Sequence, residues 1–252
     1  MSHAAEPELV ETVARTLSLD TGRAEAIIDA FDRFVARPLE ENLTKLRGRD
    51  LVKRNPMIYT ARGTTSVDVW VARVLEDKET SAIEGHIGTW MEEVARIVSG
   101  GFKPGSGVDL QREQPGDSSV VELYALQTAP NTKSAGGRRS DINALRQAAA
   151  VLRASKRKVE LYIAVLSGRK KTNPLPADPN ITLLGSDDFW EKVSGVPDFR
   201  ARLIRATTNL SAMVKSRAED EVARIKDEAQ SLFGDSDGSL RVDALADPPP
   251  SS

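Results

Sequence analysis

The sequence predicts a mixed α/β fold: an αββαβ core sheet flanked by helices, with added helices before it and one long helix after it. Three observations predict this class. Two strand-like segments, at about 107–113 and 118–128, are joined by a Gly-containing turn. A helical pattern with Ser140 as its N-cap follows them, and a nearly continuous apolar run at 158–168 is typical of a buried strand. At 252 residues the chain can form one large domain or two small ones.

The segment 1–54 is expected to form an N-terminal helical region. Residues 6–18 and 22–47 carry apolar side chains at helical spacing, and the second pattern has a start signal at Asp20 or Thr21. A break with Pro and Gly follows, and a core region is expected over 55–200.

Within this core, helices are expected at about 66–76 and 80–98. A short strand at 180–185 precedes a capped helix that ends at Gly195. The segment 201–234 predicts a long C-terminal helix, with an interruption near Thr207 left open, and 235–252 predicts a disordered tail.

Composition excludes several kinds of chemistry. Cysteine is absent, which excludes disulfides, thiolate metal sites and cysteine nucleophiles. The only histidines are His3 and His86, which argues against a zinc site or a Ser-His-Asp triad. Any metal would be held by carboxylates, which favours Mg²⁺, Mn²⁺ or Ca²⁺. No apolar run is long enough to span a membrane and no secretory signal is visible, so a cytoplasmic protein is expected.

Positive charge is concentrated in the middle of the chain. The net charge is −2, but residues 131–172 hold eleven Lys and Arg against two acids, a net +9, whereas the last 36 residues carry −5. A basic block in an otherwise acidic chain indicates a polyanionic partner for one surface; solvated helix faces and turn tips are the alternative.

The hairpin itself carries candidate catalytic groups. Asp109 lies in the first strand segment, and Glu122 and Gln127 lie on the second. Phosphodiester hydrolysis with Mg²⁺ needs carboxylates to hold the metal and a polar group to orient the attacking water. Acidic residues on hairpins are common, so a surface Asp and a solvent-facing Glu remain the alternative on spacing alone.

The order of the elements resembles the PD-(D/E)XK nuclease superfamily, and more closely the PmeII-like type II restriction endonucleases. The resemblance runs from "NPMIYTARG" (55–63) through "IGTWMEEVARIVSGGFKPGSGVDL" (87–110) to "ELYALQTAPNTKS" (122–134). It continues through the basic helix and buried strand of 142–172 and the late helix "DDFWEKVSG" (187–195). It implies a restriction-endonuclease-like fold.

The resemblance assigns candidate roles and exposes two departures. Ala125 and Gln127 stand where the superfamily has an acid and Lys, and a neutral amide can still orient water although it lacks the charge of Lys. Gln127 shares a strand face with Ala125, so Glu122 reaches the same metal only through a bulge. Otherwise the second carboxylate comes from the preceding helix, as Glu93 or Glu84. The predicted catalytic residues are Asp109, Glu122, Gln127 and Glu93, and the predicted metal ligands are Asp109, Glu122 and Glu84.

The function that follows from the resemblance is site-specific cleavage of double-stranded DNA by Mg²⁺-activated water, with Mn²⁺ as a substitute metal. A homodimer and a cognate DNA methyltransferase are the expected partners, in anti-phage defence. The expected DNA contacts come from the basic block: Lys133, Arg138, Arg139, Arg146, Arg169 and Lys170.

Two other functions remain open. One is a catalytically degenerate nuclease-fold DNA-binding subunit of a phage-defence complex, which Ala125 and Gln127 would suit. The other is an interaction domain without a nucleic-acid role. A nucleotide-hydrolysing protein is not indicated, because no G-x-x-x-x-G-K-[ST] motif is present. Trp70, Trp90 and Trp190 lie in helical patterns with apolar neighbours and are expected in the core.

Overall fold

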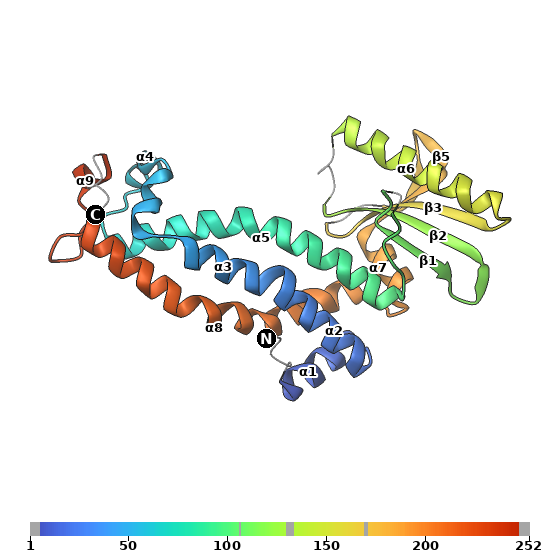
Figure 1. Ribbon diagram of the computed structural model, residues 1–252, viewed down its shortest axis with the longest axis horizontal. Helices are drawn as coiled ribbons and strands as arrows, with labels where there is room; N and C mark the ends of the chain where they lie inside the picture. Colours follow the sequence, from blue (N-terminus) through green and yellow to red (C-terminus); the bar gives the residue numbers. More distant parts are fainter. Residues whose placement is uncertain (1–5, 106, 130–133, 169–170, 247–252) are drawn as a thin grey trace. The chain divides into compact units, whose positions relative to one another are not determined.

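The computed structural model describes residues 6–105, 107–129, 134–168 and 171–246, and within these ranges the chain forms two compact units (Figure 1). The first unit comprises residues up to Ala30 together with Gly88–Leu210, and the second comprises Phe31–Ile87 together with the chain from Ser211. Two long helices, α5 (Val67–Ser99) and α8 (Phe199–Phe233), each contribute residues to both units.

A five-stranded mixed sheet organises the first unit, and its spatial order is β1-β2-β3-β5-β4. The hairpin β1/β2 is antiparallel, β2/β3 and β3/β5 are parallel, and β4/β5 is antiparallel. The helix α6 connects β2 to β3, as a parallel crossover requires. The strands are β1 (Leu110–Gln114), β2 (Asp117–Gln127), β3 (Lys158–Val165), β4 (Asn173–Leu175) and β5 (Asp178–Leu184).

The two faces of the sheet are covered by different helices (Figure 1). Helix α6 (Ala135–Ala154) packs on one face, where Leu145 and Ala149 meet Leu123 and Ala125 of β2 in one apolar cluster. Helix α7 (Ser186–Ser194) packs on the other face, where the ring of Phe189 contacts Tyr124 edge-on. The predicted mixed α/β fold with a helix-flanked core sheet is thereby confirmed, and β4 is a strand that the sequence patterns did not indicate.

The first unit also contains α1 (Pro7–Leu17) and α2 (Thr21–Phe31). The C-terminal part of α5 and the N-terminal part of α8 belong to the same unit. The indole of Trp90 on α5 donates a hydrogen bond to the Ile27 carbonyl of α2 at 3.3 Å. Trp190 donates to the Leu166 carbonyl at 2.8 Å. Trp90 and Trp190 are buried, and so is Trp70 in the second unit. The prediction that the three tryptophans belong to the core is therefore confirmed.

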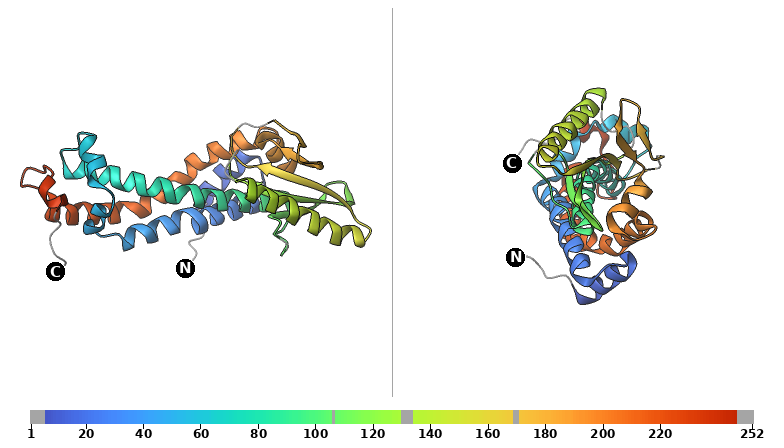
Figure 2. Two further views of the ribbon diagram at one scale, coloured as in Figure 1. Left: turned by 90° about the horizontal axis from the view of Figure 1, so that it is seen from above. Right: turned by 90° about the vertical axis from the view of Figure 1, so that its right-hand side faces the viewer.

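The second unit is helical, and the short helix α3 (Arg37–Lys45) runs beside the long helices α5 and α8 (Figure 2). Trp70 of α5 packs edge-on against Phe233 of α8 with 5.3 Å between ring centroids. Arg224 of α8 donates hydrogen bonds to the Leu43 and Leu46 carbonyls and so satisfies the C-terminal end of α3. The shorter elements are the π-helical turn Asp32–Ala36, α3 (Arg37–Lys45), a 3₁₀ segment Gly48–Lys53, α4 (Pro56–Ala61) and α9 (Val242–Ala246).

Helix boundaries depart from the sequence patterns at several places. One continuous helix, α5, replaces the two helices expected at 66–76 and 80–98, because Asp77-Lys78-Glu79 contains neither Gly nor Pro to end it. Helix α8 runs through Thr207, whose hydroxyl donates to the Ile204 carbonyl. The helix expected from 22 to 47 contains a π-helical turn just before Pro38, which has no N–H for the regular ladder.

The segment 235–246 is ordered, whereas the sequence predicted a disordered tail from residue 235. Leu240 and Leu245 are buried in the core of the second unit, and Leu240 donates its N–H to the Thr65 carbonyl at 2.8 Å. The two leucines of a polar segment therefore anchor it, a tertiary effect that local composition does not reveal. No helix in the described part of the chain is long and apolar enough to cross a membrane.

Candidate active site

Asp109 lies immediately before β1, and backbone contacts fix its position. Its N–H donates to the Tyr124 carbonyl at 3.0 Å, and its Oδ2 accepts from the Leu126 N–H at 2.8 Å. The side chain is only 21% exposed. The carboxylate is therefore held against the end of β2 while one edge stays open to solvent.

Lys103 brings a positive charge to the same carboxylate. Its Nζ lies 3.9 Å from Asp109 Oδ1. The neighbouring Phe102 forms an isolated β-bridge with Gln111, with paired backbone hydrogen bonds of 2.9 and 2.8 Å. At Gly101 a Cβ would come within 2.7 Å of the Gln111 carbonyl oxygen, so only glycine allows this close approach. Backbone pairing thus holds the segment carrying Lys103 beside the hairpin.

Gln127 ends β2 on the face that α6 covers, and its side chain is buried at 4% exposure. Its Nε2 lies 3.5 Å from Asp141 Oδ2, a long hydrogen bond. Asp141 shares a helix face with Leu145, one turn further along α6, and Leu145 is completely buried against the sheet. Helix packing therefore brings Asp141 to the end of the strand that carries Gln127.

The start of α6 lies on the chain between Gln127 and Asp141. The Ser134 hydroxyl caps this helix by accepting from the Gly137 N–H at 3.2 Å, so the helix begins earlier than the predicted start at Ser140. The loop-like sequence "SAGGRRS" is consequently its first turns, and Arg138 and Arg139 there are exposed. A helix N-terminus with exposed arginines is electrostatically suited to a phosphate group.

Glu122 points to the opposite face of the sheet. The hairpin pairs regularly from Leu110↔Tyr124 to Glu113↔Val121, so no bulge turns Glu122 toward Gln127. Its fully buried carboxylate accepts from Arg112 Nε at 2.6 Å and from the Tyr124 hydroxyl at 2.6 Å, and it forms an ion pair with Lys192 at 2.7 Å. Arg112 also donates to the Val193 and Lys192 carbonyls at the end of α7.

This environment makes Glu122 a structural anion. Burial alone would raise the pKa of its carboxyl, but hydrogen bonds from Lys192 and Tyr124 and the charge of Arg112 hold that pKa below its ordinary value. Burial raises the pKa of Tyr124, so its hydroxyl remains a donor. Two cations and a hydroxyl bind Glu122 on the face away from Gln127, so its expected role as catalytic residue and metal ligand stays a prediction that this geometry does not favour.

The two acidic candidates on α5 are placed differently. Glu93 accepts from Arg96 Nε at 2.8 Å on its own helix. Glu84 belongs to the second unit, so the structure does not place it relative to Asp109. At Gly88 a Cβ would lie 2.9 Å from the Thr128 hydroxyl, so this turn of α5 approaches the end of β2 closely.

The predicted DNA contacts fall into three groups. Arg138 and Arg139 are exposed, as a DNA contact requires. Arg146 forms an ion pair with Asp178 at 3.0 Å and links α6 to β5, although its side chain remains 55% exposed. The last group lies outside the described residues: Lys133, Arg169 and Lys170.

The donor set suits a hard cation. Among the described residues, no group of three or more His, Cys, Asp or Glu side chains is gathered closely enough to hold a metal. Asp109 contacts the Leu126 N–H and Asp141 contacts the Gln127 amide, so two carboxylates lie at the end of β2. Carboxylate, water and phosphate oxygens are the ligands that Mg²⁺ takes in phosphoryl-transfer sites. These oxygen donors fit Mg²⁺ or Mn²⁺ and do not fit a metal that prefers sulfur or imidazole.

Sequence patterns missed three of these side chains. Asp141 was visible only as an acid in a basic segment, yet its spacing of four residues from Leu145 indicates a sheet-facing position. Arg112 faces Glu122 across the hairpin, and that pairing follows once the turn is placed. Lys103 carries no such signal, because the β-bridge that positions it joins a Gly-rich segment to β1.

The αββαβ order and a hairpin that presents an acid and an amide beside a helix N-terminus define a restriction-endonuclease-like nuclease fold. A family model described as "Type II restriction endonuclease EcoO109I" matches residues 24–215. This match covers most of the chain, and the chain belongs to that family. A search of curated proteins returned no match.

Proposed function

We propose that this protein is a Mg²⁺-dependent type II restriction endonuclease that hydrolyses both strands of duplex DNA at a specific site. The observation that carries the proposal is that Asp109 and Asp141 both contact the last two residues of β2, through the Leu126 N–H and the Gln127 amide respectively. Membership of the restriction endonuclease family supports DNA as the substrate. We also propose that, among type II restriction endonucleases, this protein is most similar to the PmeII-like enzymes.

Asp109 and Asp141 would hold the metal, with Mn²⁺ as a substitute for Mg²⁺. A bound divalent ion would polarise the scissile phosphate and lower the pKa of the attacking water. Gln127 would orient that water through its amide, which both donates and accepts hydrogen bonds. The contribution of the hairpin is to hold these groups in place before substrate arrives.

Lys103 would supply the positive charge that Gln127 lacks. Its Nζ is close to Asp109 Oδ1 and it lies on a segment fixed by the Phe102–Gln111 bridge. A lysine ammonium beside the metal-binding carboxylate stabilises the negative charge that develops on the phosphate during hydrolysis. The chain thereby separates two roles, water orientation and charge stabilisation, that a single lysine serves elsewhere in the superfamily.

The remaining parts of the proposal concern DNA and partners. Arg138, Arg139 and the α6 N-terminus would contact phosphates next to the scissile bond. Cleavage of both strands at a palindromic site would use a homodimer, in which each copy cuts one strand. A cognate DNA methyltransferase would protect host DNA, and the enzyme would act in the cytoplasm against phage DNA.

Incubation of the full-length protein with phage and plasmid DNA tests this function. We expect discrete fragments with Mg²⁺ or Mn²⁺ and intact DNA with EDTA. Asp109→Asn keeps the shape of the side chain, so it should retain DNA binding in a mobility-shift assay and lose cleavage. Intact DNA in every divalent metal, across several unmodified phage genomes, would overturn the proposal.

A second candidate is a nuclease-fold DNA-binding subunit without catalytic activity. Ala125, buried at 1% exposure where the superfamily places an acid, is the observation that favours it. This candidate predicts duplex binding with a steep salt dependence and no turnover. Gln127→Lys would then leave the protein inactive.

A further inference from the structure

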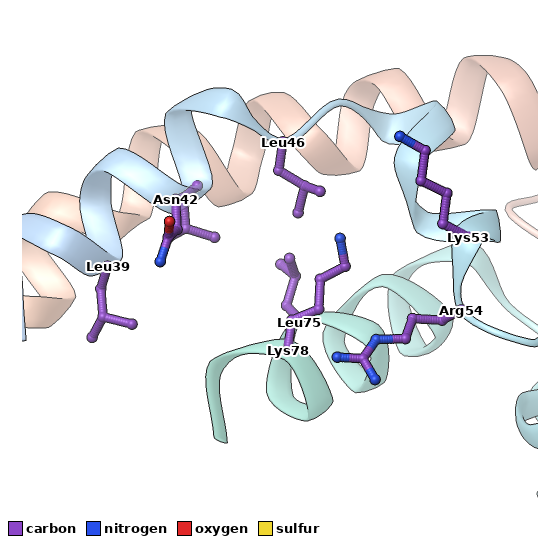
Figure 3. Close-up of a pocket in the computed structure, with 8 residues that line it drawn as sticks. Leu39, Asn42, Leu46, Lys53, Arg54, Leu75 and Lys78 are labelled. Carbon is purple, nitrogen blue, oxygen red and sulfur yellow. The ribbon is translucent and has the colours of Figure 1, made fainter. Parts of the chain in front are cut away.

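The second unit contains a cavity that the proposed nuclease site does not use (Figure 3). Its volume is about 450 Å³, within the range of small-molecule sites. It lies between α3, the end of the 3₁₀ segment at Lys53 and Arg54, and the first half of α5. All its lining residues belong to this one unit: Leu39, Asn42, Leu43, Leu46, Lys53, Arg54, Leu75 and Lys78.

The wall of this cavity is aliphatic. Leu39, Leu43 and Leu75 are each at most 5% exposed and belong to packed helices, and the half-buried Leu46 points into the space in Figure 3. No aromatic side chain occurs among the described residues that line it, so a nucleobase would lack a stacking partner. The wall therefore suits the aliphatic chain of a ligand.

The rim of the cavity is cationic. Lys53, Arg54 and Lys78 surround it, and no acid is among the described residues of the lining. Lys53 is paired with Asp50 at 2.8 Å. For Arg54 and Lys78 no ion pair within 4.0 Å occurs in the part of the chain that the structure describes. Two cations thus face an apolar space without a counter-ion in contact.

Lys78 is the rim cation whose ammonium burial disfavours. It is half-buried, and burial lowers the pKa of its ammonium; the charge of Asp50 opposes this shift, and the charges of Arg54 and Lys53 add to it. An anion bound beside it would favour the charged ammonium and so offset the hydration that burial has removed.

We propose that this cavity binds a small organic anion with an aliphatic body, such as a medium-chain carboxylate. Its chain would lie against the four leucines and its headgroup would accept hydrogen bonds from Lys78 and Arg54. The proposal concerns the second unit alone and is independent of the nuclease function.

Isothermal titration of the full-length protein with sodium decanoate below its micelle concentration tests this proposal. We expect saturable one-to-one binding and a raised melting temperature, with decanol at least about tenfold weaker because it lacks the charge. Lys78→Met should weaken decanoate binding about tenfold and leave decanol unchanged. Lys45→Met on α3 is the matched control, since this exposed lysine does not line the cavity.

Several results would overturn the proposal. These are absence of saturable decanoate binding, equal binding by decanol, or equal effects of Lys78→Met and Lys45→Met. Leu46→Trp, which fills the cavity from a half-buried position, should abolish binding, and retained affinity would contradict the assigned location. Lys78-dependent sedimentation with anionic phospholipid vesicles would identify a lipid surface instead, and displacement of decanoate by duplex DNA would identify a DNA contact.

Discussion

The two faces of the sheet carry acids in opposite circumstances. On the α7 face, Glu122 is completely buried and bound by Arg112, Lys192 and Tyr124. On the α6 face, Asp109 is partly exposed, and the ammonium of Lys103 lies 3.9 Å from its carboxylate. A buried acid paired with two cations and a hydroxyl stabilises the fold, whereas an acid held by the backbone with an open edge can bind a ligand. Strand position alone does not separate these roles; the face and the partners do.

Removing the anion on the α7 face should have the largest effect on stability. We expect Glu122→Gln to lower the free energy of unfolding by roughly 3 kcal/mol at neutral pH, because it leaves two cations without their partner. Urea denaturation of wild type and variant measures this difference.

The pH dependence of that difference follows from the lowered pKa of Glu122. The stabilisation is fully present above the ordinary value of 4.5 and is lost as pH falls through the lower folded-state pKa. The stability gap between wild type and Glu122→Gln should therefore shrink below about pH 4.5. A gap that stays constant down to acid unfolding would contradict the assigned ion cluster.

On the α6 face, Gln127→Ala should reduce the rate of DNA cleavage by about 100-fold, because the attacking water loses its orienting group. Single-turnover cleavage with excess enzyme measures this rate. Leu126→Ala, one residue earlier and on the other face, is a matched control for strand packing; an equal loss of rate in that variant would assign Gln127 a structural role only.

Lys103→Gln should slow cleavage by about tenfold and leave the dissociation constant for DNA nearly unchanged, because the charge acts on the reacting phosphate. Lys103→Arg should recover most of the rate. Cleavage at the wild-type rate by Lys103→Gln, in a protein whose wild type cleaves, would remove Lys103 from the site without affecting the rest of the proposal.

The smallest expected effect belongs to the exposed arginines of α6. Arg138→Gln and Arg139→Gln should each reduce the slope of log binding constant against log salt by about one, because each removes one phosphate contact. Fluorescence anisotropy with a labelled duplex at several salt concentrations measures the slope. An unchanged slope in the double variant would place the DNA elsewhere.

The sequence was sufficient to predict the αββαβ order, the hairpin and the burial of the three tryptophans, because those depend on local patterns and apolar periodicity. It was also sufficient to predict that Glu122 and Gln127 face opposite ways. The sequence could not predict the partners of Glu122, because Lys192 lies on α7, seventy residues later in the chain. Asp141 and Lys103 likewise reach the site only through helix packing and a single β-bridge.

In the second, helical unit, Gly48 also makes contacts that the sequence alone does not predict. Gly48 was inconspicuous in the sequence, yet a Cβ there would come within 2.8 Å of the Ala229 nitrogen on α8. Its N–H donates to Glu228 at 2.7 Å. Both contacts join residues far apart in the chain, and no local pattern encodes such a contact.

The central claim is that the chemistry resides on the α6 face of the sheet. It is tested most directly by Mg²⁺-dependent cleavage rates of Asp109→Asn and Glu122→Gln, each expressed per folded molecule. We predict that Asp109→Asn loses at least about 100-fold in rate with DNA binding retained. Glu122→Gln should cleave at close to the wild-type rate once its lower stability is taken into account. Full activity in Asp109→Asn together with loss of cleavage in folded Glu122→Gln would contradict the claim.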